Sequence, residues 1–150
     1  MVTEQEQEQE ARYLSTTFKV DMKWLAAQGR SVQLLLLNRR CASCWGGFVQ
    51  EPAKGRDVGA AVHLKQIAQH CSAAPDFIHF ELPIMEAVFR ILLSTGNKPT
   101  TLESIYQTLQ ERWLDPANPR TPRLEKLYRI LSNDTSYGIS QVPEPATKGK

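Results

Sequence analysis

All six cysteine and histidine residues of this 150-residue chain fall between Cys41 and His79. Cys41 and Cys44 form a Cys-x-x-Cys pair, and Cys71 directly follows His70. A turn at a Cys-x-x-Cys pair brings two sulfurs within reach of one metal ion, whereas three cysteines are too few for the disulfide framework of a small secreted protein. The spacing therefore predicts a fold in which two distant segments are held together by a metal ion.

The simplest set of four ligands is Cys41, Cys44, His70 and Cys71, with His63 and His79 as alternatives for the histidine. A closed set of this kind is typical of structural zinc, so zinc is the expected metal. It would join the end of a helix expected at 31–40 to the end of another at 57–70. Such a staple would offset the small core available to a region of about 60 residues.

Three other interpretations of the cysteines stay open. An iron–sulfur cluster could use three cysteines and a histidine, and would make the protein a redox sensor. A Cys-x-x-Cys pair can also form a thiol–disulfide couple, although the strand-to-helix alternation of thioredoxin-like folds is missing around it. Finally, the three cysteines could be buried as small apolar residues without any metal.

The net charge of +2 hides a segregation of charge along the chain. Four glutamates alternate with glutamines near the start, so residues 1–11 are expected to form a disordered acidic tail. Without residues 1–10 the chain has eighteen bases and twelve acids, and residues 19–65 alone carry a net charge of +5. A basic body suits a polyanionic partner. Residues 143–150 are expected to be a second disordered tail.

Composition and motifs exclude several classes of protein. No apolar run approaches the roughly 20 residues that a membrane-spanning helix needs, and the acidic N-terminus is unlike a signal peptide, so we expect a cytoplasmic protein with no membrane association. Phosphate-binding loops and the common hydrolase motifs are missing as well. We therefore do not expect an enzyme.

Capping residues and apolar periodicity predict a mainly helical chain with a small β component. Asp21 and Ser31 can cap two short helices, and Asp57 can cap a third that ends near His70. Residues 12–80 are thus expected to form a helical zinc-binding region. A short strand is expected within residues 13–20.

Residues 81–142 follow a second pattern. Three apolar stripes at helical spacing are separated by a tight turn and a loop, and a short strand follows; the stripes lie at 84–93, 101–109 and 122–131. This order resembles the winged helix-turn-helix family of DNA-binding domains. The resemblance implies that the third helix enters the major groove and that a wing lies around 136–139, where Gly138 would allow close approach to a backbone.

The candidate nucleic-acid contacts lie in two places. The resemblance implies base and phosphate contacts from the third helix, whose outer face would carry Arg120, Arg123, Lys126, Arg129 and Asn133. Near the cysteines, the residues suited to phosphate are Arg39, Arg40 and Lys54. The third helix is a modest candidate, because residues 82–142 hold seven bases and six acids.

The sequence thus predicts a mainly α (α+β) protein, with an N-terminal metal-stapled helical region packed on a winged-helix domain. Its expected function is binding of nucleic acid, most simply duplex DNA, in transcriptional regulation or within a nucleic-acid machine. Two alternatives remain. The winged helix could dock onto protein as an adaptor in a larger complex, or the chain could be an iron–sulfur redox sensor.

Overall fold

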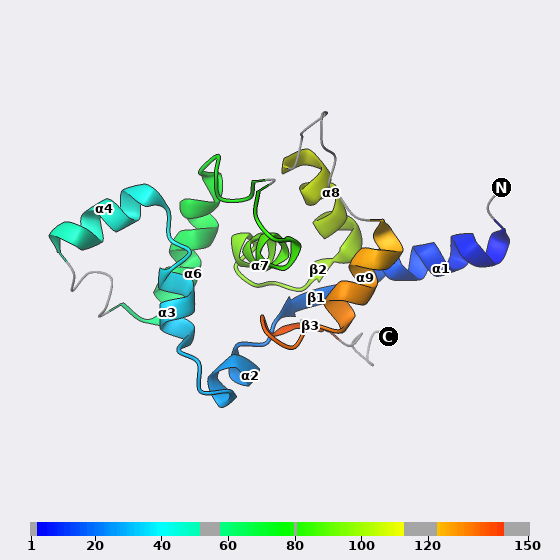
Figure 1. The fold of residues 1–150 in the computed structure, drawn as a ribbon, viewed down its shortest axis with the longest axis horizontal. Helices are drawn as coiled ribbons and strands as arrows, with labels where there is room; N and C mark the ends of the chain where they lie inside the picture. Colours follow the sequence, from blue (N-terminus) through cyan, green and yellow to red (C-terminus); the bar gives the residue numbers. More distant parts are fainter. Residues whose placement is uncertain (1–2, 52–57, 80, 113–122, 143–150) are drawn as a thin grey trace, which may run out of the picture.

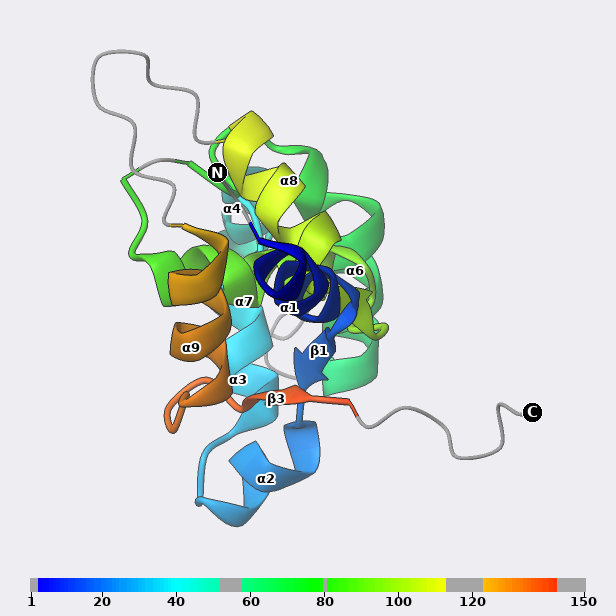
Figure 2. The same cartoon turned by 90° about the vertical axis from the view of Figure 1, so that its right-hand side faces the viewer.

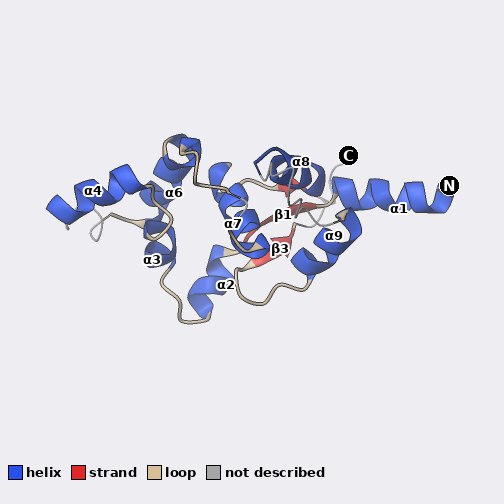
Figure 3. Ribbon diagram, turned by 45° about the horizontal axis from the view of Figure 1, so that its top comes forward, coloured by secondary structure: helices blue, strands red, loops and turns tan. Residues whose placement is uncertain are grey.

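The computed structural model describes residues 3–51, 58–79, 81–112 and 123–142. They form a mostly helical fold with one small antiparallel sheet, as expected (Figure 3). In none of these segments is a helix both long and apolar enough for a bilayer crossing. In chain order the elements are α1 (Glu4–Ser15), β1 (Thr17–Val20), α2 (Met22–Ala27), α3 (Val32–Leu37), α4 (Ala42–Gln50), α6 (Ala60–Gln69), the 3-10 helix η1 (Cys71–Ala73), α7 (Ile84–Ser94), β2 (Thr100–Thr101), α8 (Leu102–Arg112), α9 (Leu124–Ser132) and β3 (Ile139–Gln141).

The sheet has the strand order β2-β1-β3, so its central strand comes from near the N-terminus. Phe18 pairs with Thr100 on one side and with Gln141 on the other. Both outer strands follow residue 80 in the chain. The sheet therefore joins the two regions that the sequence divides at residues 80 and 81.

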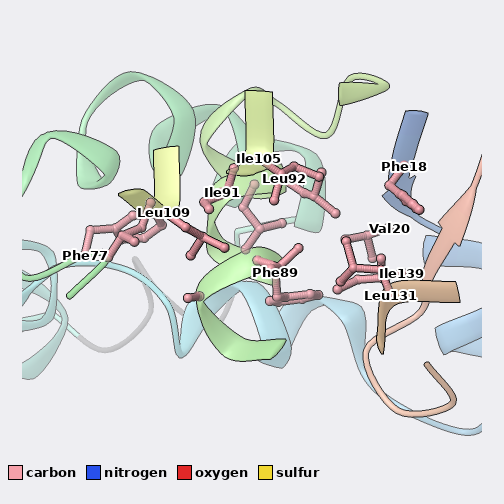
Figure 4. Close-up of a cluster of buried hydrophobic side chains, with 14 of the residues drawn as sticks. Phe18, Val20, Phe77, Phe89, Ile91, Leu92, Ile105, Leu109, Leu131 and Ile139 are labelled. Carbon is pink, nitrogen blue, oxygen red and sulfur yellow. The ribbon is translucent and has the colours of Figure 1, made fainter. Parts of the chain in front are cut away.

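Helix α7 lies at the centre of the molecule. Its buried apolar side chains project from several sides of the helix into the core. Figure 4 shows Phe89, Ile91 and Leu92 of α7 among side chains from the sheet and from the helices around it. The six residues of α7 that are buried are Ala87, Val88, Phe89, Ile91, Leu92 and Leu93. In Figure 1, α3, α4 and α6 lie on one side of α7, and α8, α9 and α1 lie on the other.

Local capping signals account for several helix boundaries. The Asp21 side chain accepts the N–H of Trp24, and the Ser31 hydroxyl accepts the N–H of Leu34, which confirms two of the three predicted caps. The third, Asp57, lies outside the described residues, and the N-cap of α6 is Gly59. The first turn of α8 is capped by Thr101, whose hydroxyl accepts the N–H of Ser104. Thr100, the residue before it, pairs with Phe18 in the sheet.

The acidic segment expected as a disordered tail at residues 1–11 is helical from Glu4 onwards. Thr3 caps α1, and none of the residues of α1 is buried. The helix packs beside α8 and α9 (Figure 2). Tyr13 of α1 stacks on Tyr128 of α9, with 4.3 Å between ring centroids. The tyrosine contact at its C-terminal end anchors a helix that has no apolar stripe of its own.

The loop expected to form a wing has a different role in the structure. Gly138 is buried, and its carbonyl accepts the N–H of Asp21 at 2.7 Å. The Asp134 carboxylate accepts the N–H groups of Tyr137 and Ile139 from the same loop. The loop leads from α9 into β3 and packs on α2, so Gly138 approaches the protein's own backbone.

We expect Gly138→Ala to destabilise the fold more than Gly29→Ala. Both glycines have positive φ, of 73° and 79°, a conformation that costs an alanine about 1 kcal/mol. A Cβ at Gly138 would also lie 3.0 Å from Leu25 Cγ and 3.3 Å from the Asp21 carbonyl, whereas one at Gly29 meets nothing within 4 Å. Overpacking should add about 2 kcal/mol for Gly138→Ala. Equal free energies of urea unfolding for the two variants would contradict this account.

Candidate metal centre

Three segments bring the candidate ligands together. Cys41 is the N-cap of α4, and Cys44 lies in the first turn of that helix. His70 ends α6, and Cys71 begins η1. Because α3 packs along α6, the chain leaving α3 enters α4 beside the end of α6 (Figure 1). The expected junction between two helix ends therefore exists in the structure.

The sulfur and nitrogen atoms lie at distances that one metal ion can bridge. The ligand atoms of Cys41, Cys44 and His70 all lie within 4.8 Å of one another. The Cys44 sulfur is 3.6 Å from that of Cys41 and 3.7 Å from that of Cys71. A tetrahedral zinc ion, with Zn–S bonds of about 2.3 Å, separates two thiolate sulfurs by about 3.8 Å. The four side chains thus form a cluster that could hold a metal ion.

Burial and hydrogen bonding shift the pKa values of Cys41 and Cys71 in opposite directions. Burial acts to raise the pKa of Cys41, but hydrogen bonds with Ser43 and Cys44 outweigh it and lower that pKa to about 6. Burial raises the pKa of Cys71 to about 11, although this sulfur accepts the N–H of Cys41 at 3.2 Å. A bound cation would favour the thiolate form of both residues.

The other two histidines differ from His70. His63 is completely buried, and its Nδ1 lies 2.8 Å from a guanidinium nitrogen of Arg40. Arginine only donates hydrogen bonds, so this nitrogen of His63 is the acceptor and is engaged away from the thiols. His79 is half-buried and is not part of the cluster. Of the three histidines, His70 is the one whose ring reaches Cys41 and Cys44.

The two arginines before Cys41 point into the protein. Arg39 forms an ion pair with Glu86 at 2.8 Å, and its guanidinium group lies over the Phe89 ring. Arg40 donates to the Cys44 sulfur at 3.2 Å as well as to His63. Both guanidinium groups are thus engaged in contacts within the protein. Their expected contacts with phosphate stay a prediction that this geometry does not favour.

The remaining candidates lie on or near α9. Arg123, Lys126, Arg129 and Asn133 are all exposed. Arg129 pairs with Glu125 at 2.9 Å, and the Asn133 amide donates to the Arg129 carbonyl. Lys54 and Arg120 lie outside the described residues. The candidates on α9 are far along the molecule from α4 in Figure 1, so the structure separates the two predicted groups.

Some features of the centre have little signal in the sequence. Ser43 bridges the cluster, because its hydroxyl lies 3.3 Å from the Cys41 sulfur and 3.3 Å from His70 Nε2. The Cys-x-x-Cys pair begins a helix instead of forming only a turn, although Gly46 and Gly47 follow it. His63 and His70 are seven residues apart, a spacing that places both on one side of a helix. This spacing is the signal in the sequence that indicates that His63 lies near the cluster.

Comparison with protein-family models, curated proteins and solved structures found no match for this chain. The resemblance to the winged helix therefore depends on the order of its elements alone.

We expect His70→Ala to lower metal content and His79→Ala to leave it unchanged. His70 lies within ligand distance of two cysteines, whereas His79 is outside the cluster. The measurement is metal content by mass spectrometry on purified wild type, both variants and Cys44→Ser. A colourless wild-type protein with about one zinc per chain fits a closed site with three cysteines and one histidine.

Two outcomes would contradict this assignment. Equal metal content in wild type, His70→Ala and Cys44→Ser would remove the site altogether. Iron together with visible absorbance would replace zinc by an iron–sulfur cluster.

We expect Glu86→Gln to destabilise the protein by about 2 kcal/mol near neutral pH, because the carboxylate, only 12% exposed, pairs with both Arg39 and Arg90. Burial acts to raise the pKa of Glu86, but the two arginines outweigh it and lower that pKa. The ionised carboxylate therefore adds stability above its unfolded pKa, and this stability is lost as the pH falls through the folded pKa. Urea unfolding from about pH 7 to about pH 3 should show a weaker pH dependence in the variant.

Glu125→Gln is the matched control for this experiment. It removes the same charge from an i,i+4 pair in which both side chains are about two-thirds exposed. Its effect should stay within about 0.5 kcal/mol. Equal effects of the two substitutions would show that the Glu86 pair does not stabilise the junction between α3 and α7.

Proposed function

We propose that this protein is a zinc-stabilised nucleic-acid-binding protein that contacts duplex DNA through α9. The observation that carries the proposal is the burial pattern of α9. Leu127 and Leu131 are buried in the core, whereas Arg123, Lys126 and Arg129 are exposed along the other side. A short helix with an apolar inner face and a basic outer face fits a major groove.

The metal has a structural role in this proposal. Zinc bound by Cys41, Cys44, His70 and Cys71 would hold α4 and the end of α3 against the end of α6. With four protein ligands no position remains for a substrate, which is typical of structural sites. The sulfur distances of 3.6 and 3.7 Å favour one ion over a four-iron cluster, in which each thiolate binds a different iron atom.

The order of elements from α7 to β3 supports a winged-helix-like arrangement. Helix α7, strand β2, helices α8 and α9, and strand β3 follow one another as in that family. The central strand β1 comes from before these elements, and the loop at 136–139 packs on α2. The proposal therefore assigns recognition to α9 without a contribution from a wing.

The charge around α9 is mixed. Glu6 and Glu10 of α1 line a surface hollow together with Arg123, and Glu125 pairs with Arg129. These carboxylates weaken the positive potential at two of the basic positions. Lys126 has no ion pair with any described residue. We therefore propose Lys126 as the strongest phosphate contact on α9.

A protein-docking adaptor is the second candidate function. Its support is a set of three large apolar side chains that are exposed: Leu34 is 52% exposed, Trp45 is 38% exposed and Val62 is 51% exposed. They belong to α3, α4 and α6, at the end of the molecule opposite α1 (Figure 1). Exposed large apolar residues at one end of a molecule can mark a protein contact.

We expect the double variant Arg123→Ala, Lys126→Ala to bind a duplex DNA of mixed sequence at least about tenfold more weakly than wild type. The slope of log affinity against log salt concentration should fall by about 2, because two phosphate or base contacts are removed. Fluorescence anisotropy with a labelled duplex at several salt concentrations measures both quantities.

The matched control is Lys19→Ala, Lys23→Ala, which removes the same charge from β1 and α2. Binding that weakens equally in both double variants would indicate attraction to total charge only. If the α9 variant keeps wild-type affinity and salt slope, α9 is not the recognition helix. If wild type does not bind DNA at all, the adaptor becomes the better interpretation.

A further inference from the structure

Arg40 places a positive charge inside the thiol cluster. One guanidinium nitrogen, Nη2, donates to the Cys44 sulfur at 3.2 Å, and the other, Nη1, donates to His63 Nδ1 at 2.8 Å. The group also lies over the Phe48 ring, 5.2 Å from its centroid. Its Nε is buried and has no hydrogen-bond partner. The contacts on these sides leave the guanidinium group only partly exposed to water.

A partly buried cation is stabilised by a nearby anion, because desolvation of an unpaired charge is costly. Every other arginine ion pair within the described residues uses a carboxylate: Arg39 and Arg90 pair with Glu86, and Arg129 with Glu125. Arg40 has no ion pair with a described carboxylate. The groups facing it that can become anionic are the thiols of Cys44 and Cys71, both of which contact it.

His63 does not add a positive charge to this arrangement. Its Nδ1 accepts a hydrogen bond from Arg40, so the ring is in the neutral form. The completely buried imidazole instead fixes the orientation of the guanidinium group toward the sulfurs. Arg40 is then the one cation in direct contact with the cysteines among the described residues.

We propose that Arg40 balances the charge of the metal centre as a positioning residue. The inference rests on the proposed zinc site. Three thiolates, one neutral imidazole and a divalent ion carry a net charge of −1, which the guanidinium group neutralises within the cluster. The hydrogen bond to Cys44 also holds that sulfur in its ligand position. Residues that orient ligands in this way typically change metal affinity by about 10- to 100-fold when they are replaced.

The test separates charge from shape at Arg40. Arg40→Gln keeps a hydrogen-bond donor but removes the positive charge. Arg40→Lys keeps the positive charge but replaces the planar guanidinium group by an ammonium group. We expect the glutamine variant to bind zinc about 10- to 100-fold more weakly and the lysine variant to stay within about threefold of wild type. Competition with a chromophoric chelator measures the affinity, and the cobalt(II) spectrum reports whether three thiolates still bind.

Arg129→Gln is the matched control, because it removes one charge from an exposed site on α9 and should leave zinc affinity unchanged. Equal affinities of wild type and Arg40→Gln would overturn the proposal. A loss of more than about tenfold in the zinc affinity of Arg40→Lys would also overturn it. The lysine variant therefore tests the proposal even if the glutamine variant does not fold. A wild-type protein that binds neither zinc nor cobalt would instead overturn the zinc site itself.

Discussion

The position of β1 in the middle of the sheet is the constraint on which the rest of the structure depends. Phe18 and Val20 are completely buried, and both edges of the strand are paired with strands from the far end of the chain. Beyond the end of β2, the Asn97 side chain accepts the Val20 N–H at 2.7 Å and donates to its carbonyl at 2.8 Å. An amide with both a donor and an acceptor thus takes the place of the missing strand. This arrangement leaves few backbone groups of β1 unsatisfied and fixes α2 and α3 relative to α7.

Local signals made part of this fold predictable from the sequence. A capping side chain acts within three residues, so Asp21 and Ser31 could be identified without any tertiary information. The apolar stripe of α7 was equally clear, because a central helix needs apolar residues on much of its circumference. The helicity of α1 was not predictable in the same way. Its one strong anchor is the stacking of Tyr13 on Tyr128, which is more than 100 residues away in the chain.

The cluster of candidate metal ligands was also predictable, for a different reason. Cysteine and histidine are few in this chain and gathered in one segment, so their arrangement carries information even without a structure. The role of Arg40 could not be found in this way. In the sequence, Arg39 and Arg40 are two equivalent bases at the end of an expected helix. In the folded protein Arg39 pairs with Glu86 of α7, whereas Arg40 contacts Cys44 and His63. This difference depends on the packing of elements that are distant in the sequence.

Because Arg39 and Arg40 point into the protein, the net charge of the sequence overestimates the positive charge that a partner would meet at the surface. The excess of +5 in residues 19–65 counts Arg39 and Arg40 as though both faced solvent. In the structure Arg39 shares the carboxylate of Glu86 with Arg90, and Arg40 faces thiols that a formal count treats as uncharged. With the proposed zinc bound, the cluster contributes its own negative charge. The long-range attraction for a polyanion is therefore weaker than the composition suggests, and the proposed binding of nucleic acid depends on local contacts of α9.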